Sequence, residues 1–167
     1  MNISKYIRSI LLNLYYFKTL SKRCIFGRNV NIVGNVHFAD RIALDDNVEV
    51  RNLTSQELYI GSHTSINRNT VIRGKVKIGE NVSIAPNCMI IGASHRFDDV
   101  NKIIKEQGFV VKGIEIGSDV WIGANCCILD GTTIGSGCVI GAGSIVTKSI
   151  PPGCVAFGNP CRVVRKR

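Results

Sequence analysis

The sequence lacks the features that mark disulfide-stabilised and metal-binding proteins. Its seven cysteines are odd in number and include no C-x-x-C pair, so they favour reduced thiols in a cytosol over a disulfide framework. Its three histidines, His37, His63 and His95, lie 26 and 32 residues apart, which is a poor spacing for a zinc site that takes two ligands close in sequence. We therefore expect neither structural disulfides nor a bound metal.

A long hydrophobic run is also missing. Residues 10–17 are apolar but are interrupted by Asn13, and they fall far short of the roughly 20 residues that span a bilayer. The run lacks a small-residue cleavage site, so we expect this segment to be retained rather than removed as a signal peptide.

Acidic residues are absent before Asp40, although the same stretch carries six lysines and arginines. These six supply most of the chain's formal net charge of +9. Such a basic block suits anionic lipid, nucleic acid or a phosphate-bearing ligand. No nucleic-acid-binding motif accompanies the charge, so we expect no nucleic-acid partner.

Aliphatic residues recur at every sixth position through most of the chain. One series runs unbroken from Val30 to Ile90, with Thr54 as its one member that is not aliphatic, and a second runs from Ile116 to Val146 in a frame displaced by two residues. Glycine often follows the repeat aliphatic, and a small or β-branched residue often stands two positions before it. An irregular segment must therefore separate Ile90 from Ile116.

A period of six fits neither a helix face nor a long alternating strand. It indicates short strands separated by turns, coiled so that each repeat stacks on an earlier one. The aliphatic residues then form interior ladders, and glycine suits corners where the backbone is unusual or space is short. Three hexapeptides per coil would make a triangular prism, and 167 residues suit one domain with a single core.

This repeat, together with residues 116–167, resembles the hexapeptide-repeat acyltransferases, especially the sugar O-acetyltransferases that include the galactoside, maltose and nodulation-factor enzymes. The resemblance covers about residues 30–165. It implies an all-β fold, a left-handed parallel β-helix, that assembles as a homotrimer with active sites between neighbouring subunits. It also implies acetyl-CoA as acyl donor and a carbohydrate as acceptor.

The irregular segment, about residues 92–113, is mostly polar and charged. A loop of this length inside a compact fold is usually functional or disordered. In the resembling enzymes a loop leaves the β-helix near this point and helps to enclose the acceptor, and a histidine at its start is the catalytic base. His95 matches that histidine by position, with an ordinary solvated histidine as the alternative. His37 and His63 lie within the repeat and are expected to be structural or surface residues.

The proposed chemistry has a physical reason to use imidazole. An alcohol is a poor nucleophile at neutral pH, and an imidazole that titrates near neutrality can remove its proton as it attacks the thioester carbonyl. A backbone N–H can then stabilise the oxyanion that forms.

The resemblance also implies a donor groove between subunits. In it the pantetheine contacts backbone near small residues and the phosphates reach basic side chains. Mapped onto this sequence, the candidate donor residues are Ala124, Ala142, Thr147, Lys148, Arg162 and Arg165. Guanidinium suits phosphate because its donors are paired and its charge persists. Tight coil corners and a solvated basic tail are the alternatives.

The acceptor side departs from the family pattern. Sugar enzymes typically carry an asparagine pair below the histidine and an acidic residue slightly later, whereas this chain has Ser65 and Asn67, followed by Arg73. We expect these three residues and Trp121, whose ring should point outward, to line the acceptor site. Arg73 would tolerate an anionic glycan or a nucleotide-linked sugar, or be an ordinary exposed charge.

Residues 1–23 are predicted to form an amphipathic basic helix, ahead of a β-helix domain at 24–167 with a basic C-terminal tail. The helix could cap the open end of the solenoid. It could also lie on an anionic membrane surface. We therefore expect a cytoplasmic protein, with peripheral contact at the inner face of the membrane as one option.

The sequence is compatible with three functions. The favoured one is acetyl-CoA-dependent O-acetylation of a carbohydrate, in bacterial surface polysaccharide or glycan biosynthesis, with coenzyme A as the group carrier. The alternatives are N-acetylation of an amino sugar or small amine, and a non-catalytic structural β-helix.

Overall fold

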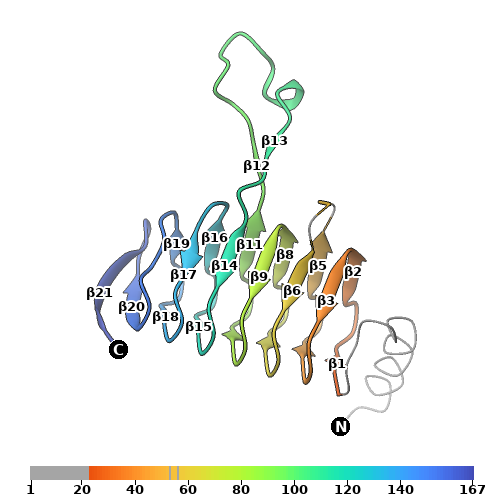
Figure 1. The fold of residues 1–167 in the computed structure, drawn as a ribbon, viewed down its shortest axis with the longest axis vertical. Coiled ribbons are helices and arrows are strands. Elements are labelled where there is room, and N and C mark those ends of the chain that lie inside the picture. Colours follow the sequence, from red (N-terminus) through yellow and green to blue (C-terminus); the bar gives the residue numbers. More distant parts are fainter. Residues whose placement is uncertain (1–22, 53, 56) are drawn as a thin grey trace.

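The computed structural model describes residues 23–52, 54–55 and 57–167 (Figure 1). The helix predicted over residues 1–23 lies outside the described residues, apart from its last position. Within the described part of the chain, no helix is long and apolar enough to cross a membrane.

The described chain is wound into a triangular solenoid of three sheets, which confirms the predicted parallel β-helix (Figure 1). Each sheet takes one strand from each successive turn, so neighbouring strands run parallel; the exception is the antiparallel pair β20 and β21 at the C-terminal end. We call the eight-stranded, six-stranded and five-stranded sheets the first, second and third faces.

The first face has the order β1 (Ile25–Phe26), β4 (Ala43–Leu44), β7 (Ser65–Ile66), β10 (Ser83–Ile84), β15 (Trp121–Ile122), β18 (Val139–Ile140), β20 (Cys154–Phe157) and β21 (Arg162–Lys166). The second face has β2 (Asn31–Gly34), β5 (Glu49–Asn52), β8 (Val71–Gly74), β11 (Met89–Gly92), β16 (Cys127–Leu129) and β19 (Ile145–Val146). The third face has β3 (Val36–Phe38), β6 (Leu58–Ile60), β9 (Val76–Ile78), β14 (Ile114–Ile116) and β17 (Thr133–Ile134).

Each hexapeptide buries two side chains that stand two positions apart. Cys88 and Ile90 are both fully buried, because side chains alternate along a strand and positions i and i+2 share its inner side. In the second face Ile72, Ile90 and Ile128 stand in register on adjacent strands. The predicted interior ladders are therefore present, and their apolar contacts fill the prism.

The glycines that follow the repeat aliphatics are needed because the coils approach closely. A Cβ on Gly123, for example, would lie 2.6 Å from the backbone nitrogen of Ala142 in the next coil. Positive φ angles occur elsewhere, at the corner residues.

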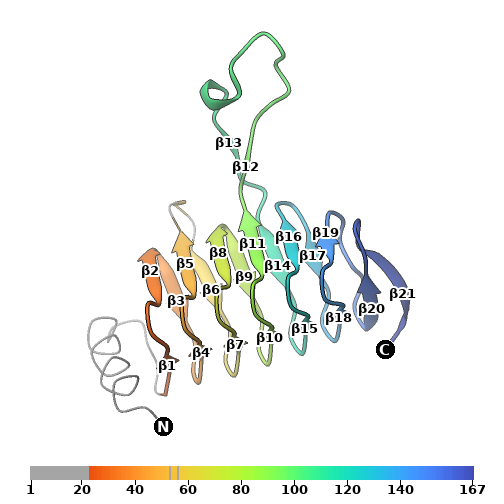
Figure 2. The same cartoon turned by 180° about the vertical axis from the view of Figure 1, so that it is seen from behind.

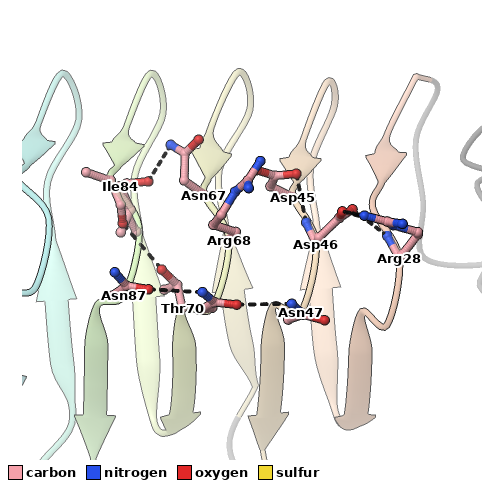
Figure 3. Close-up of polar contacts among 11 residues, drawn as sticks. Arg28, Asp45, Asp46, Asn47, Asn67, Arg68, Thr70, Ile84 and Asn87 are labelled. Carbon is pink, nitrogen blue, oxygen red and sulfur yellow. Dashed lines mark hydrogen bonds and ion pairs between the residues drawn. The ribbon is translucent and has the colours of Figure 1, made fainter. Parts of the chain in front are cut away.

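One corner is a ladder of asparagines in the left-handed region. Asn29, Asn47, Asn69, Asn87 and Asn125 have φ angles between 54° and 62°, which asparagine tolerates better than most residues. The side-chain amide of each of the first three donates to the next asparagine at 3.1 Å, as Figure 3 shows from Asn47 to Asn87. The ladder fixes the turn between the first and second faces.

His63 lies at a second corner of the solenoid, where the turn accounts for its position. It has a φ of 60° and stands in a row with Arg41, Asn81 and Asp119, which also have positive φ. His37 lies on the third face and stacks on Tyr59 with ring centroids 5.3 Å apart. Both histidines therefore belong to the coils, in agreement with the structural or surface role expected for them.

The repeat frame from Val30 to Ile90 is interrupted, which corrects the unbroken frame read from the sequence. Asn31 pairs with Glu49, 18 residues later, but Glu49 pairs with Val71, 22 residues later. The four extra residues lie in the turn between β5 and β6. The spacing of six nevertheless continues, because each hexapeptide buries two residues that stand two positions apart. Val48 is the first residue of its buried pair (with Val50), whereas Ile60 is the second of its pair (with Leu58). Four extra residues plus this shift of two make up one further period of six.

Candidate active site

The two interruptions of the repeat lie on the same edge of the solenoid. Figure 2 shows the long loop that carries β12 (Ser94–His95) and β13 (Phe109–Val110) leaving the same end of the second face as the turn after β5. Between them lies a pocket of about 800 Å³. Its lining comprises Arg51, Thr54, Ser55, Arg73, Gly74, Ile91, Ala93, Ser94, His95, Phe109 and Val111.

His95 lies at the base of the loop and lines this pocket. It pairs with Phe109 in the antiparallel ribbon of β12 and β13, and their rings lie 4.3 Å apart between centroids. The side chain is exposed and has no ion pair with a described residue. An imidazole that is held by backbone pairing and an aromatic neighbour, and that makes no ring hydrogen bond to another described residue, is suited to proton transfer.

The long loop is anchored at its return and within its own span. The Asp130 carboxylate accepts hydrogen bonds from the backbone N–H groups of Lys112 and Gly113, at 3.1 and 2.7 Å. Further out, the Gln107 amide bonds both backbone groups of Asp99, next to a short 3₁₀ helix at Ile104–Glu106. These contacts hold the ribbon that carries His95.

Arg73, one of the residues predicted to line the acceptor site, also lines this pocket. It stands between Arg51 and Ile91 in the outward-facing row of the second face. Its Nε lies 2.7 Å from a carboxylate oxygen of Glu49. This hydrogen bond lowers the pKa of Glu49 and raises that of Arg73, so both groups are charged at neutral pH.

The other predicted acceptor residues are not brought to this pocket. Ser65 and Trp121 lie on the first face, in one row on either side of Ser83, and Trp121 is exposed. Asn67 follows at the corner, where its amide donates to the carbonyl of Ile84 at 2.8 Å (Figure 3).

The predicted donor residues gather at the C-terminal coils. Gly143 N–H donates to the Ala124 carbonyl at 2.8 Å, which places Ala124 beside the corner that holds Ala142. Thr147 and Lys148 follow β19 and are exposed. Arg162 and Arg165 are exposed on β21.

Sequence reasoning missed Arg51, Thr54, Ser55 and Phe109. The sequence signal for Thr54 and Ser55 was Thr54 itself, which is not aliphatic although it stands in the series from Val30 to Ile90. The spacing of six otherwise concealed the insertion, and Arg51 on β5 carried no signal. Phe109 carried no such signal, because its pairing with His95 depends on how the loop folds back.

The chemistry of the described residues offers no obvious rival to His95. No group of three or more His, Cys, Asp or Glu side chains within residues 23–52, 54–55 and 57–167 is placed to hold a metal. All seven cysteines are free thiols, and six of them are buried.

The chain is similar to known proteins in both sequence and fold. The family model of the bacterial transferase hexapeptide, with six repeats, matches residues 58–92 and 113–148. A hexapeptide-repeat acetyltransferase of Vibrio cholerae, solved in complex with acetyl coenzyme A, is 30% identical with a TM-score of 0.62, over 84% of this chain and 71% of that one. The chain belongs to the hexapeptide-repeat acyltransferase family.

Two further matches describe the range of this family. Galactoside O-acetyltransferase of Escherichia coli K12 is 45% identical over 112 residues, which are 65% of this chain and 54% of that protein. An N-acyltransferase of Bacillus cereus, solved with dTDP and 3-hydroxybutyryl-CoA, has a TM-score of 0.82 at 20% identity, over 94% of this chain and 87% of that one. This last likeness shows the fold. The chain spans between 37% and 56% of the length of the first curated relatives it matches.

Proposed function

We propose that the protein transfers an acetyl group from acetyl-CoA to a hydroxyl group of a carbohydrate. The observation that carries the proposal is the position of His95, which lines a pocket enclosed by both interruptions of an otherwise regular coil. The acetyl-CoA complex of the Vibrio cholerae relative supports the donor, and the Escherichia coli galactoside enzyme supports an oxygen acceptor on a sugar.

In the proposed reaction, His95 removes the proton from the acceptor hydroxyl as its oxygen attacks the thioester carbonyl. The tetrahedral oxyanion then collapses, the carbon–sulfur bond breaks, and the coenzyme A thiolate takes a proton from the imidazolium. This route needs no covalent enzyme intermediate, because both substrates meet in a ternary complex. The products are the acetyl ester and coenzyme A.

The proposal includes a donor site at the C-terminal coils and a trimeric assembly. Ala124, Ala142, Thr147, Lys148, Arg162 and Arg165 form its donor contacts. Exposed apolar side chains on the loop, such as Phe97 and Ile103, and Trp121 on the first face support burial against further copies of the chain. A role in bacterial surface polysaccharide or glycan synthesis, in the cytoplasm, completes the proposal.

The experiment that tests this function compares pairs of acceptors in which an amine replaces one hydroxyl group of the sugar. A panel of monosaccharides is incubated with acetyl-CoA beside the matching amino sugars, and products are identified by mass spectrometry and NMR. We expect acetyl esters from the sugars. Acetamides formed only from the amino sugars would assign the protein to N-acetylation, and the absence of both transfer and acetyl-CoA binding would favour a structural β-helix.

A further inference from the structure

We propose that the acceptor carries an anionic group, a carboxylate or a phosphate, which Arg51 and Arg73 bind on the wall of the His95 pocket. This inference rests on the proposed function for the identity of the site as an acceptor site. It adds the charge of the substrate, which the resemblance to galactoside-type enzymes does not supply.

The first observation is that two arginines are direct neighbours across strands β5 and β8. Arg51 and Arg73 are register partners, and adjacent strands lie about 4.8 Å apart. Like charges directly opposite each other destabilise a sheet. The residues on either side of the pair in this row are Val33 and Ile91, so the two guanidinium groups are an exception within an otherwise apolar row.

The second observation is that the pair is only half neutralised. Glu49 forms the ion pair with Arg73, and the positive charge of Arg51 contributes further to lowering the pKa of Glu49. One carboxylate therefore lies near two guanidinium groups. Glu49, Arg51 and Arg73 together therefore carry one excess positive charge. The Thr54 and Ser55 hydroxyls and His95 line the same pocket.

The third observation concerns Arg51 itself. Its Nε is buried and has no hydrogen-bond partner among the described residues. Arg28, Arg68 and Arg167 each have a carboxylate partner, at 2.9, 3.4 and 2.8 Å. A buried donor without a partner is costly, and an oxyanion in the pocket would give the Arg51 guanidinium an anionic partner such as the other three arginines have.

An oxyanion fits this arrangement chemically. Guanidinium presents paired donors that match carboxylate and phosphate oxygens, and such charge-assisted bonds are stronger than neutral ones. The pocket, at about 800 Å³, falls in the range that holds a small organic ligand. An acid group held by Arg51 would orient the sugar so that one hydroxyl faces His95.

The test measures binding without turnover, so that it does not depend on the acetyl donor. Methyl glucoside, glucuronate and glucose 1-phosphate are titrated separately and followed by ligand-observed NMR. We expect at least one of the two anionic probes to bind at least tenfold more tightly than methyl glucoside. Preference for glucuronate identifies a carboxylate, and preference for glucose 1-phosphate identifies a phosphate.

Three variants assign the preference to residues. Arg51→Gln should reduce the affinity for the preferred anionic probe about 10- to 100-fold. Glu49→Gln should increase it, because the competing carboxylate is removed. Arg68→Gln is the matched control: it removes the same charge from the neighbouring coil, which carries Arg73, at a residue outside the pocket lining, and should leave the affinity unchanged.

The proposal is overturned by equal binding of neutral and anionic probes, by the absence of binding of all three, or by a preference that survives Arg51→Gln. Weaker anion binding in Glu49→Gln would also contradict it. Neutral acceptors that are acetylated as well as acidic ones would refute the anion site but leave the acetyltransferase function standing. Anion binding without acetyl transfer to any acceptor would support the anion site and contradict the proposed acetyltransferase function.

Discussion

His95 differs from the other two histidines in what surrounds its ring. His63 is fixed by a corner φ of 60°, and His37 stacks on Tyr59 and lies 3.8 Å from Glu57. His95 instead is exposed, lines the pocket, and has its backbone held in the ribbon of β12 and β13. Three histidines of similar appearance in the sequence therefore have different environments, and His95 is the one that lines the pocket of about 800 Å³.

The cysteines give a prediction at the same scale. Burial raises the pKa of the Cys24 and Cys161 thiols, and a hydrogen bond with Cys126 raises that of Cys88 while it lowers that of Cys126 to about 7. Cys126 is nevertheless only 1% exposed. We expect no fast reaction of Cys126 with a thiol reagent in the folded protein, because the reagent cannot reach it.

Thiol titration with mass-spectrometric mapping checks this expectation. Cys127, which is partly exposed, should be the first to react, and all seven should react after denaturation. Rapid labelling of Cys126 in the folded state would show that this thiol is accessible and would reopen a cysteine nucleophile as an alternative to His95.

At the scale of the element, the asparagine corner illustrates how one residue type serves two needs. It adopts the left-handed backbone and also passes a hydrogen bond from coil to coil. The second corner has similar φ angles at Arg41, His63, Asn81 and Asp119. The turn therefore explains why a polar residue stands at each of these positions, and no catalytic role is needed to explain it.

Asn69 provides the test of this corner. Asn69→Ala removes two hydrogen bonds and places a side chain that disfavours positive φ, so we expect a loss of about 1–3 kcal/mol in the free energy of unfolding. Asn69→Gly keeps the backbone preference and should lose less. Urea unfolding at one fixed protein concentration measures both, and an equal loss in the two variants would show that the positive φ contributes nothing.

At the scale of the whole molecule, the sequence predicted the coil better than the pocket. Ile72, Ile90 and Ile128 were placed in the core from a period of six, because burial of aliphatic residues dictates that period. His95 and Arg73 were linked to the acceptor through the family resemblance. Ser65, Asn67 and Trp121 were linked to it in the same way, but Ser65 and Trp121 lie on the first face and Arg73 on the second. A period of six gives the buried positions and does not say which outward-facing residues border one pocket.

The pocket depends on that insertion and on the long loop together, which lie far apart in sequence and close together on one edge of the solenoid (Figure 2). The insertion contributes Thr54 and Ser55 to the lining, and the loop contributes residues from Ala93 to Val111, so a coil without the two interruptions would lack these walls. The two interruptions therefore shape the pocket in which we propose that the acetyl transfer takes place.

The most direct test of this account is the turnover of His95→Ala with the best acceptor from the hydroxyl panel. Because His95 is exposed and outside the core, the variant should keep its thermal transition and its calorimetric affinity for acetyl-CoA. Its turnover number should fall about 10²- to 10⁴-fold, the usual contribution of a positioned base. Retention of most of the activity, with folding and donor binding intact, would contradict the assignment of His95 as the base.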